Sequence, residues 1–178
     1  EARIKVIGSE NWSDNEEFFS AIKSFGVNGI CGSGIIEVIA EMYLAGIISS
    51  EGVIDGSLTD KFPSIIKDGR TFSYVLYHGD GDSKKKKNIV ITQNDIRQIQ
   101  LAKAALYAGI KLLMDELKIS HVNRIKLAGA FGTHISVKHA MILGLIPDCT
   151  LAKVSSIGNA AETGARIALL NKDQRRVI

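Results

Sequence analysis

Hydrophobic positions in the first 46 residues predict a short strand and two helices. The apolar run at 3–8 is typical of a strand, and the "SDNE" spacing matches a capping box, with Ser13 as the cap. The apolar positions that follow lie on one helical face, and Gly26 is expected to end this helix. A second helix with an apolar stripe is expected between Ser33 and Gly46.

The middle of the chain predicts a hairpin and a long helix. "TFSYVLYH" (71–78) and "NIVIT" (88–92) are typical of two antiparallel strands. Thr92 and Asp95 have capping-box spacing and open a helix that is expected to run to about Leu117. Alanines and a glycine make part of this helix thin, so that another backbone could approach closely.

The last third alternates regularly between strand and helix patterns. Strands are predicted at 124–129 and 151–156, and each is followed by a helix, at 136–144 and 159–170. Asn159 is in position to cap the last helix. This spacing favours parallel strands joined by crossover helices, and therefore an α/β sheet covered by helices.

Length and composition indicate one globular domain that does not bind nucleic acid. The chain has 178 residues, 46% of them hydrophobic and 23% charged, and a formal net charge of +3. Its lysines gather in "GDGDSKKKKNIV" (79–90), which is typical of a solvated loop and, as an alternative, could dock an acidic partner. No apolar run reaches the length of a membrane span, and no signal peptide is recognised. The start "EARIKVIG" lacks an initiator methionine and suggests a piece of a longer or processed chain.

Cysteine and histidine spacing predicts neither a disulfide nor a metal centre. Cys31 and Cys149 are far apart and form no CxxC pattern, which is typical of a reduced, cytoplasmic protein. His121, His134 and His139 have no acidic or thiol partner nearby to complete a ligand set, so structural or surface roles are expected.

Two glycine-rich segments are the candidate binding elements. "GICGSG" (29–34) is neither a dinucleotide fingerprint nor a P-loop, but it places glycines and Ser33 at the start of a helix, where backbone N–H groups favour an anion. The alternative is that Ser33 is a plain N-cap. "LAGAFGTH" (127–134) leaves a strand at its carboxyl end, where α/β sheets bind ligands, and the alternative is an ordinary strand–helix turn.

Several stretches, taken in order, closely resemble the carboxyl-terminal part of the reductive activators of corrinoid proteins. These stretches are "GICGSGIIEVIAEMYLAGII", "ITQNDIRQIQLAKAALYAGIKLLMDEL", "IKLAGAFGTHI", "LGLIP" and "SSIGNAAETGARIALL". The resemblance covers most of 27–170. It implies a ribonuclease-H-like, actin-type lobe with a mixed sheet and helices on both faces, from the superfamily of acetate and sugar kinases, heat-shock chaperones and actin. Residues 1–178 would then form a single domain, the second lobe of an ATPase.

The resemblance also implies an activity for the parent protein. Such activators use ATP, with Mg²⁺, to drive the reduction of cob(II)alamin to cob(I)alamin on a corrinoid protein or a corrinoid-dependent methyltransferase. The electron comes from an iron–sulfur domain, which we expect elsewhere in the parent chain. Asp55 is typical of a turn, so no acidic residue of a first phosphate loop is found, and the chain alone is expected to lack ATPase activity.

The resemblance implies a set of nucleotide-binding positions, and no catalytic residue can be assigned. "LAGAFG" is similar to an adenosine loop, and "GICGSG" to a glycine loop near the phosphates; a lysine on the long helix could reach the nucleotide or be solvated. The implied positions are Gly32, Ser33, Gly34, Lys103, Gly129, Ala130, Phe131 and Gly132. Two alternatives remain: a docking or dimerising lobe that uses the thin helix 95–117, and a small-molecule kinase.

Overall fold

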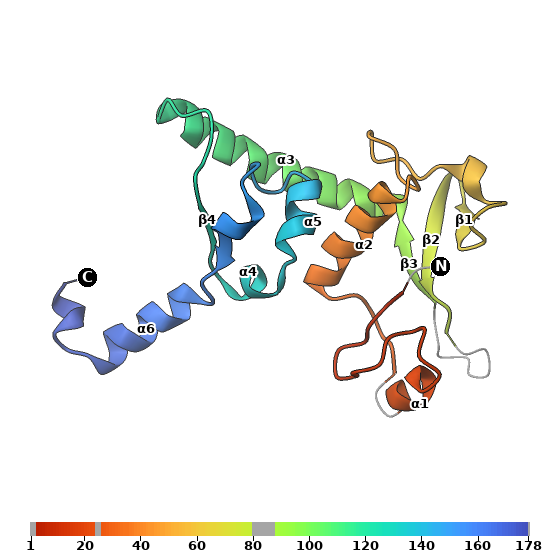
Figure 1. Ribbon diagram of the computed structural model, residues 1–178, viewed down its shortest axis with the longest axis horizontal. Helices are drawn as coiled ribbons and strands as arrows, with labels where there is room; N and C mark the ends of the chain where they lie inside the picture. Colours follow the sequence, from red (N-terminus) through yellow and green to blue (C-terminus); the bar gives the residue numbers. More distant parts are fainter. Residues whose placement is uncertain (1–2, 24–25, 80–87, 178) are drawn as a thin grey trace. The chain divides into compact units, whose positions relative to one another are not determined.

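A computed structural model describes residues 3–23, 26–79 and 88–177. The chain divides into two compact units, one formed by 1–30 with 43–98 and the other by 31–42 with 99–178. The lysine-rich segment lies mostly outside the described residues. Figure 1 labels the main helices and strands in chain order.

The first unit is built on an antiparallel sheet of order β1-β2-β3. Its strands are β1 (Ile65–Asp68), β2 (Thr71–Tyr77) and β3 (Ile89–Thr92). Tyr74 pairs with Ile65 on one side and with Ile91 on the other, and these three side chains are all buried. The predicted antiparallel pairing of 71–78 with 88–92 is therefore confirmed.

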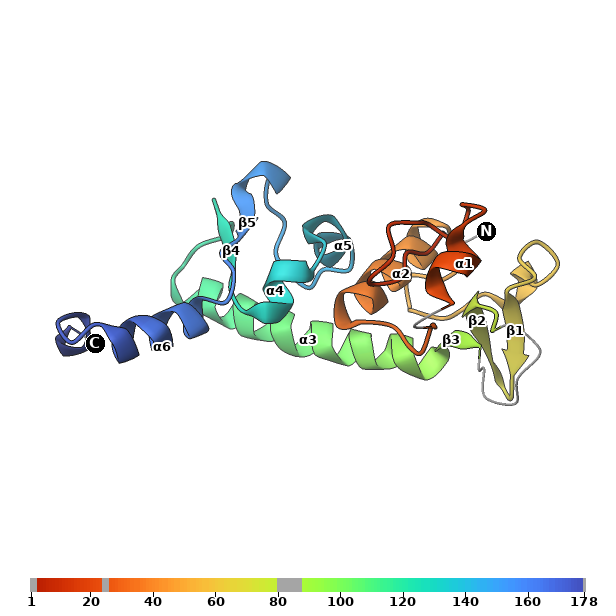
Figure 2. The ribbon, with the colours of Figure 1, turned by 90° about the horizontal axis from the view of Figure 1, so that it is seen from below.

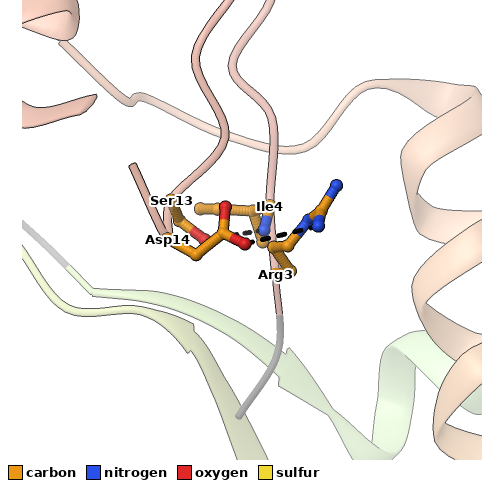
Figure 3. A network of polar contacts seen from close by, with 4 residues as sticks. All are labelled: Arg3, Ile4, Ser13 and Asp14. Carbon is orange, nitrogen blue, oxygen red and sulfur yellow. Dashed lines mark hydrogen bonds and ion pairs between the residues drawn. The ribbon is translucent and has the colours of Figure 1, made fainter. Parts of the chain in front are cut away.

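The amino-terminal segment folds differently from the prediction. Residues 3–8 form no strand; they contribute only an isolated bridge between Lys5 and Trp12. Ser13 caps no helix, because its Oγ accepts a hydrogen bond from the Ile4 N–H at 2.9 Å, beside an ion pair of 3.3 Å between Arg3 and Asp14 (Figure 3). The prediction failed because the Ser13 hydroxyl, which the local spacing assigned to a helix cap, bonds instead to the backbone of Ile4, nine residues earlier.

The first helix is consequently shorter than expected. Helix α1 (Phe18–Ile22) begins after Glu17, which makes no side-chain capping bond. The Gly26 N–H donates to the Ile22 carbonyl at 2.7 Å, and Gly26 has φ +69°, a conformation typical of the residue after a helix. Phe18 and Ile22 are buried.

The two longer predicted helices are confirmed. Helix α2 (Gly32–Leu44) buries Ile36, Ile39 and Met42 along the expected stripe. Helix α3 (Gln93–Glu116) starts with the predicted capping box, in which the Asp95 carboxylate accepts from the Thr92 N–H at 2.8 Å, and the Thr92 hydroxyl accepts from the Asp95 N–H at 3.1 Å.

The second unit contains the predicted parallel strands. Strands β4 (Ile125–Leu127) and β5 (Val154–Ser156) pair in parallel, with Ile125 opposite Val154, and Figure 2 shows them side by side. Residues 151–153 form a 3₁₀ turn and not the start of the strand. Three helices belong to this part of the chain: α4 (Ala130–His134), α5 (Val137–Ile142) and α6 (Ala160–Leu170).

The core of the second unit joins α2, α5 and β5. Ile36, Ala140, Leu145, Ile146 and Val154 form its buried cluster. Helix α6 has no buried residue, although Asn159 caps it as predicted, by accepting from the Glu162 N–H at 3.3 Å. Two short 3₁₀ turns, Gly56–Leu58 and Gln174–Arg176, complete the described elements.

Candidate functional site

The first glycine segment is capped by a thiol. Cys31 precedes α2, and its Sγ accepts from the Gly34 N–H at 3.3 Å and lies 3.4 Å from the Ser33 hydroxyl. The alternative expectation, that Ser33 itself is the cap, is wrong, because Ser33 already lies inside the first turn. The hydrogen bond from Ser33 is the largest cause that lowers the pKa of the exposed Cys31 thiol; burial, the next largest, opposes it, and the hydrogen bond from the Gly34 N–H lowers the pKa further.

The second glycine segment bends sharply as it leaves β4. Gly129 has φ +99° and ψ 164°, a region that is essentially restricted to glycine. Its N–H donates to the Gly158 carbonyl at 2.9 Å, and its carbonyl accepts from the Thr133 hydroxyl at 3.0 Å. A Cβ at Gly129 would meet no atom within 4 Å, so this bend faces open space that a ligand could enter.

Gly132 has a structural reason to be glycine. A Cβ on Gly132 would lie 3.3 Å from the carbonyl carbon of Leu127 and 3.3 Å from the Leu127 Cβ. The segment after β4 leads through Gly129 directly into the short helix α4, so its backbone has the form of the strand–helix turn given as the alternative. The lack of a side chain at Gly132 is therefore explained by close packing of α4 on β4, without a ligand.

The structure brings the two glycine segments together. A Cβ at Gly32 would lie only 3.0 Å from the ring of Phe131, and the Phe131 side chain is 53% exposed. Gly32 opens α2 and Phe131 lies in the first turn of α4, so the two predicted segments share one surface within the second unit.

Lys103 lies against a different part of the unit. A Cβ at Gly144, in the turn after α5, would be 3.2 Å from the Lys103 ammonium nitrogen. The contact described for Lys103 is thus with this turn. The remaining predicted positions lie in the first turns of the two short segments: Ser33 and Gly34 in α2, and Ala130 in α4.

His139 has the structural role expected of it. Its Nδ1 is 2.7 Å from the Ser136 hydroxyl, and its Nε2 is 2.7 Å from the Glu41 carboxylate on α2. The contact with Glu41 ties α5 to α2 and so helps to position the helix that carries the first glycine segment, whereas Ser136 directly precedes α5. Within the described residues no three His, Cys, Asp or Glu side chains are grouped to hold a metal ion.

The whole chain, residues 1–178, matches the protein family described as "C-terminal domain of RACo the ASKHA domain". The chain belongs to this family. The resemblance inferred from the ordered motifs is therefore confirmed, and so is the actin-type, ribonuclease-H-like α/β fold class.

The names of two relatives refer to corrinoid activation. The chain is 38% identical over 180 aligned residues to "Corrinoid activation enzyme RamQ" of Eubacterium limosum, which covers 96% of this chain and 29% of that protein. A solved structure, "Reductive activator for corrinoid,iron-sulfur protein", is similar with a TM-score of 0.71 and 36% identity over 81% of this chain and 23% of the other. The chain thus spans less than a third of either relative.

None of the helices among the described residues is both long enough and apolar enough to cross a bilayer.

Proposed function

We propose that the chain is the nucleotide-binding lobe of an ATP-dependent reductive activator of a corrinoid protein or corrinoid-dependent methyltransferase. The observation that carries the proposal is the contact between Gly32 and the Phe131 ring, which joins the two glycine segments on one surface. Family membership and the names of both relatives agree with a role in corrinoid activation.

The residues present fit a nucleotide. The bend at Gly129 leaves backbone facing open space, and the exposed Phe131 ring offers a flat apolar wall for a base. The first turn of α2, a helix of 13 residues, offers the N–H groups of Gly32 and Ser33 to phosphates. In this arrangement the glycines allow close approach, and the helix start supplies positive partial charge.

The remaining parts of the reaction would come from the longer protein. Bound ATP, with Mg²⁺, would supply the free energy for transferring one electron to cob(II)alamin, giving cob(I)alamin, and an iron–sulfur domain outside these residues would supply that electron. Asp55 holds its own turn, because its carboxylate accepts from the Ser57 N–H at 2.9 Å. The 178-residue chain alone is therefore expected to bind nucleotide weakly and not to hydrolyse it.

Calorimetric titration of the chain with ADP tests the proposal. The Ala130→Glu variant places bulk and negative charge on the loop, and Ala108→Glu, at an exposed alanine of α3, makes the same change elsewhere on the same unit. We expect Ala130→Glu to abolish a binding isotherm that Ala108→Glu retains. Equal affinity of both variants for ADP would contradict the assignment of the loop.

A second candidate function, a docking or dimerising lobe, is favoured by the surface of α3. Leu112, Leu113 and Leu117 are 71%, 66% and 68% exposed at the end of this helix and just beyond it. Sedimentation of the chain over a range of concentrations tests self-association through this surface. A species that stays monomeric at high concentration would count against a homodimer of this kind.

A further inference from the structure

The two parallel strands have one buried and one charged face. Ile125 and Leu127 of β4 and Val154 of β5 point to the core of the second unit. Lys126 and Ser155 are register partners on the opposite face, and the Lys126 ammonium donates to the Ser155 hydroxyl at 2.9 Å. Because side chains alternate along a strand, this face is polar while its reverse is apolar.

Three cations gather on the charged face. A hollow of about 570 Å³ is lined by Arg124, Lys126 and Lys153, together with Asn123, Ala152 and Ser155. The three cationic residues are exposed, and no ion pair joins them to an acidic side chain within the described ranges. The hollow is therefore a concentrated positive surface without its own counter-charge.

A second hollow continues the first. It has a volume of about 560 Å³, shares Asn123 and Lys153 with the basic hollow, and adds apolar walls from Val122, Met141 and Cys149. The acidic group in its lining is Asp148. The two hollows together combine a strongly basic part with a partly apolar part.

This surface is separate from the proposed nucleotide loops. Arg124 and Lys153 stand at the amino ends of β4 and β5, whereas Gly129 and Gly158 follow the carboxyl ends. A parallel strand advances about 3.3 Å per residue, so three residues separate the two edges by about 10 Å. A test of one surface is therefore independent of the other.

We propose that the basic hollow and its apolar neighbour dock an acidic segment of a partner protein, with its carboxylates over Arg124, Lys126 and Lys153 and an aliphatic side chain against Met141. The three charged groups belong to separate, flexible side chains, so each can bind a different carboxylate of an extended peptide. A single phosphate is normally held by convergent donors and backbone N–H groups, and this hollow lies at no helix start. Charge complementarity with the unpaired cations selects an acidic partner.

The test uses a fluorescein-labelled short peptide of Glu, Asp and Leu, and a matched peptide in which Gln and Asn replace the acids. Binding to the 178-residue chain is followed by fluorescence anisotropy at low and moderate salt. We expect binding of the acidic peptide alone, weakened by salt. The double variant Lys126→Glu/Lys153→Glu should lower the affinity by about tenfold or more, because a like charge opposite a carboxylate costs binding energy.

The matched control is Lys67→Glu/Lys172→Glu, which changes the net charge equally at two exposed lysines outside both hollows. It should keep the affinity of the native chain within about twofold. Amide chemical shifts of the native chain, titrated with the acidic peptide, should move at 123–126 and 152–155. Equal weakening by both double variants, shifts confined to other residues, or displacement of the peptide by inorganic phosphate at equimolar concentration would each overturn the proposal.

Discussion

The two sheets of this protein differ in how well the rest of the described chain buries them. The antiparallel sheet β1-β2-β3 buries Ile65, Tyr74 and Ile91 to 5% exposure or less. The parallel pair β4-β5 has three-residue strands, and α6, which follows it, has no buried residue. Antiparallel strands that are neighbours in sequence can pair through a short connection. Parallel strands need a long crossover connection and are normally covered on both faces of the sheet.

This difference indicates where the stability of the chain lies. Burial in the first unit should account for much of the free energy of unfolding, since buried apolar area is the main favourable contribution. Exposed leucines on α3 and α6 contribute little in the isolated chain. Four measurements test whether stability is distributed in this way.

The largest expected effect is at Ile91, whose side chain is 1% exposed in β3. Replacing it by alanine leaves a cavity and should lower the free energy of unfolding by about 2–5 kcal/mol. The matched change Leu112→Ala, at a residue 71% exposed on α3, should cost less than about 0.5 kcal/mol. Urea unfolding measures both, and similar losses would mean that α3 is covered in solution.

The next effect separates two glycines of the second unit. Gly132→Ala forces a Cβ against the Leu127 backbone and should destabilise by about 1–3 kcal/mol. Gly164→Ala, in α6, meets nothing within 4 Å and should stabilise by up to about 1 kcal/mol, because alanine favours a helix. Thermal unfolding should therefore move in opposite directions, and the same sign for both would refute the packing argument.

A smaller effect distinguishes the helix caps. Thr92→Ala removes half of the reciprocal capping box of α3 and should cost about 1 kcal/mol. Cys31→Ala removes a thiol acceptor from the start of α2 and should cost less, because sulfur is the weaker acceptor. Chemical denaturation of the two variants gives the comparison, and the reverse order would contradict it.

The smallest effect concerns reactivity and leaves stability nearly unchanged. The Ser33 hydroxyl lowers the pKa of Cys31, so more thiolate is present near neutral pH, and alkylation by iodoacetamide should be faster at Cys31 than at the half-buried Cys149. Ser33→Ala should raise this pKa and move the alkylation profile of Cys31 to higher pH. Mass spectrometry resolves the two sites, and Cys149 serves as the internal control. An unchanged profile in Ser33→Ala would contradict the role given to the hydroxyl.

Local patterns predicted the elements whose bonds are made between near neighbours. The Thr92 and Asp95 box, the Asn159 cap and the turn at Asp55 each join residues two or three apart, so their spacing can be recognised in the sequence alone. The antiparallel pairing of β2 with β3 was predicted for a similar reason, because its register depends on the alternation of side chains along two short strands.

Predictions failed where a local pattern competed with another contact. Ser13 has the spacing of a helix cap, but its hydroxyl accepts from the Ile4 N–H. Ser33 was considered as the cap of α2, but the Cys31 thiol accepts the hydrogen bond there. The reason for glycine at position 132 is contact with Leu127, which no spacing rule identifies. The assignment of nucleotide-binding positions remains a prediction.

Sequence patterns were sufficient to predict the family, most of the elements and the two glycine segments, because these depend on residues that are close along the chain. The contacts of Gly32 with Phe131 and of Lys103 with Gly144, and the three cations that line one hollow beside β4 and β5, became visible in the folded chain alone. The physical reason is that such contacts are set by how helices and strands pack across long stretches of chain, and packing depends on shape and burial that local patterns do not specify.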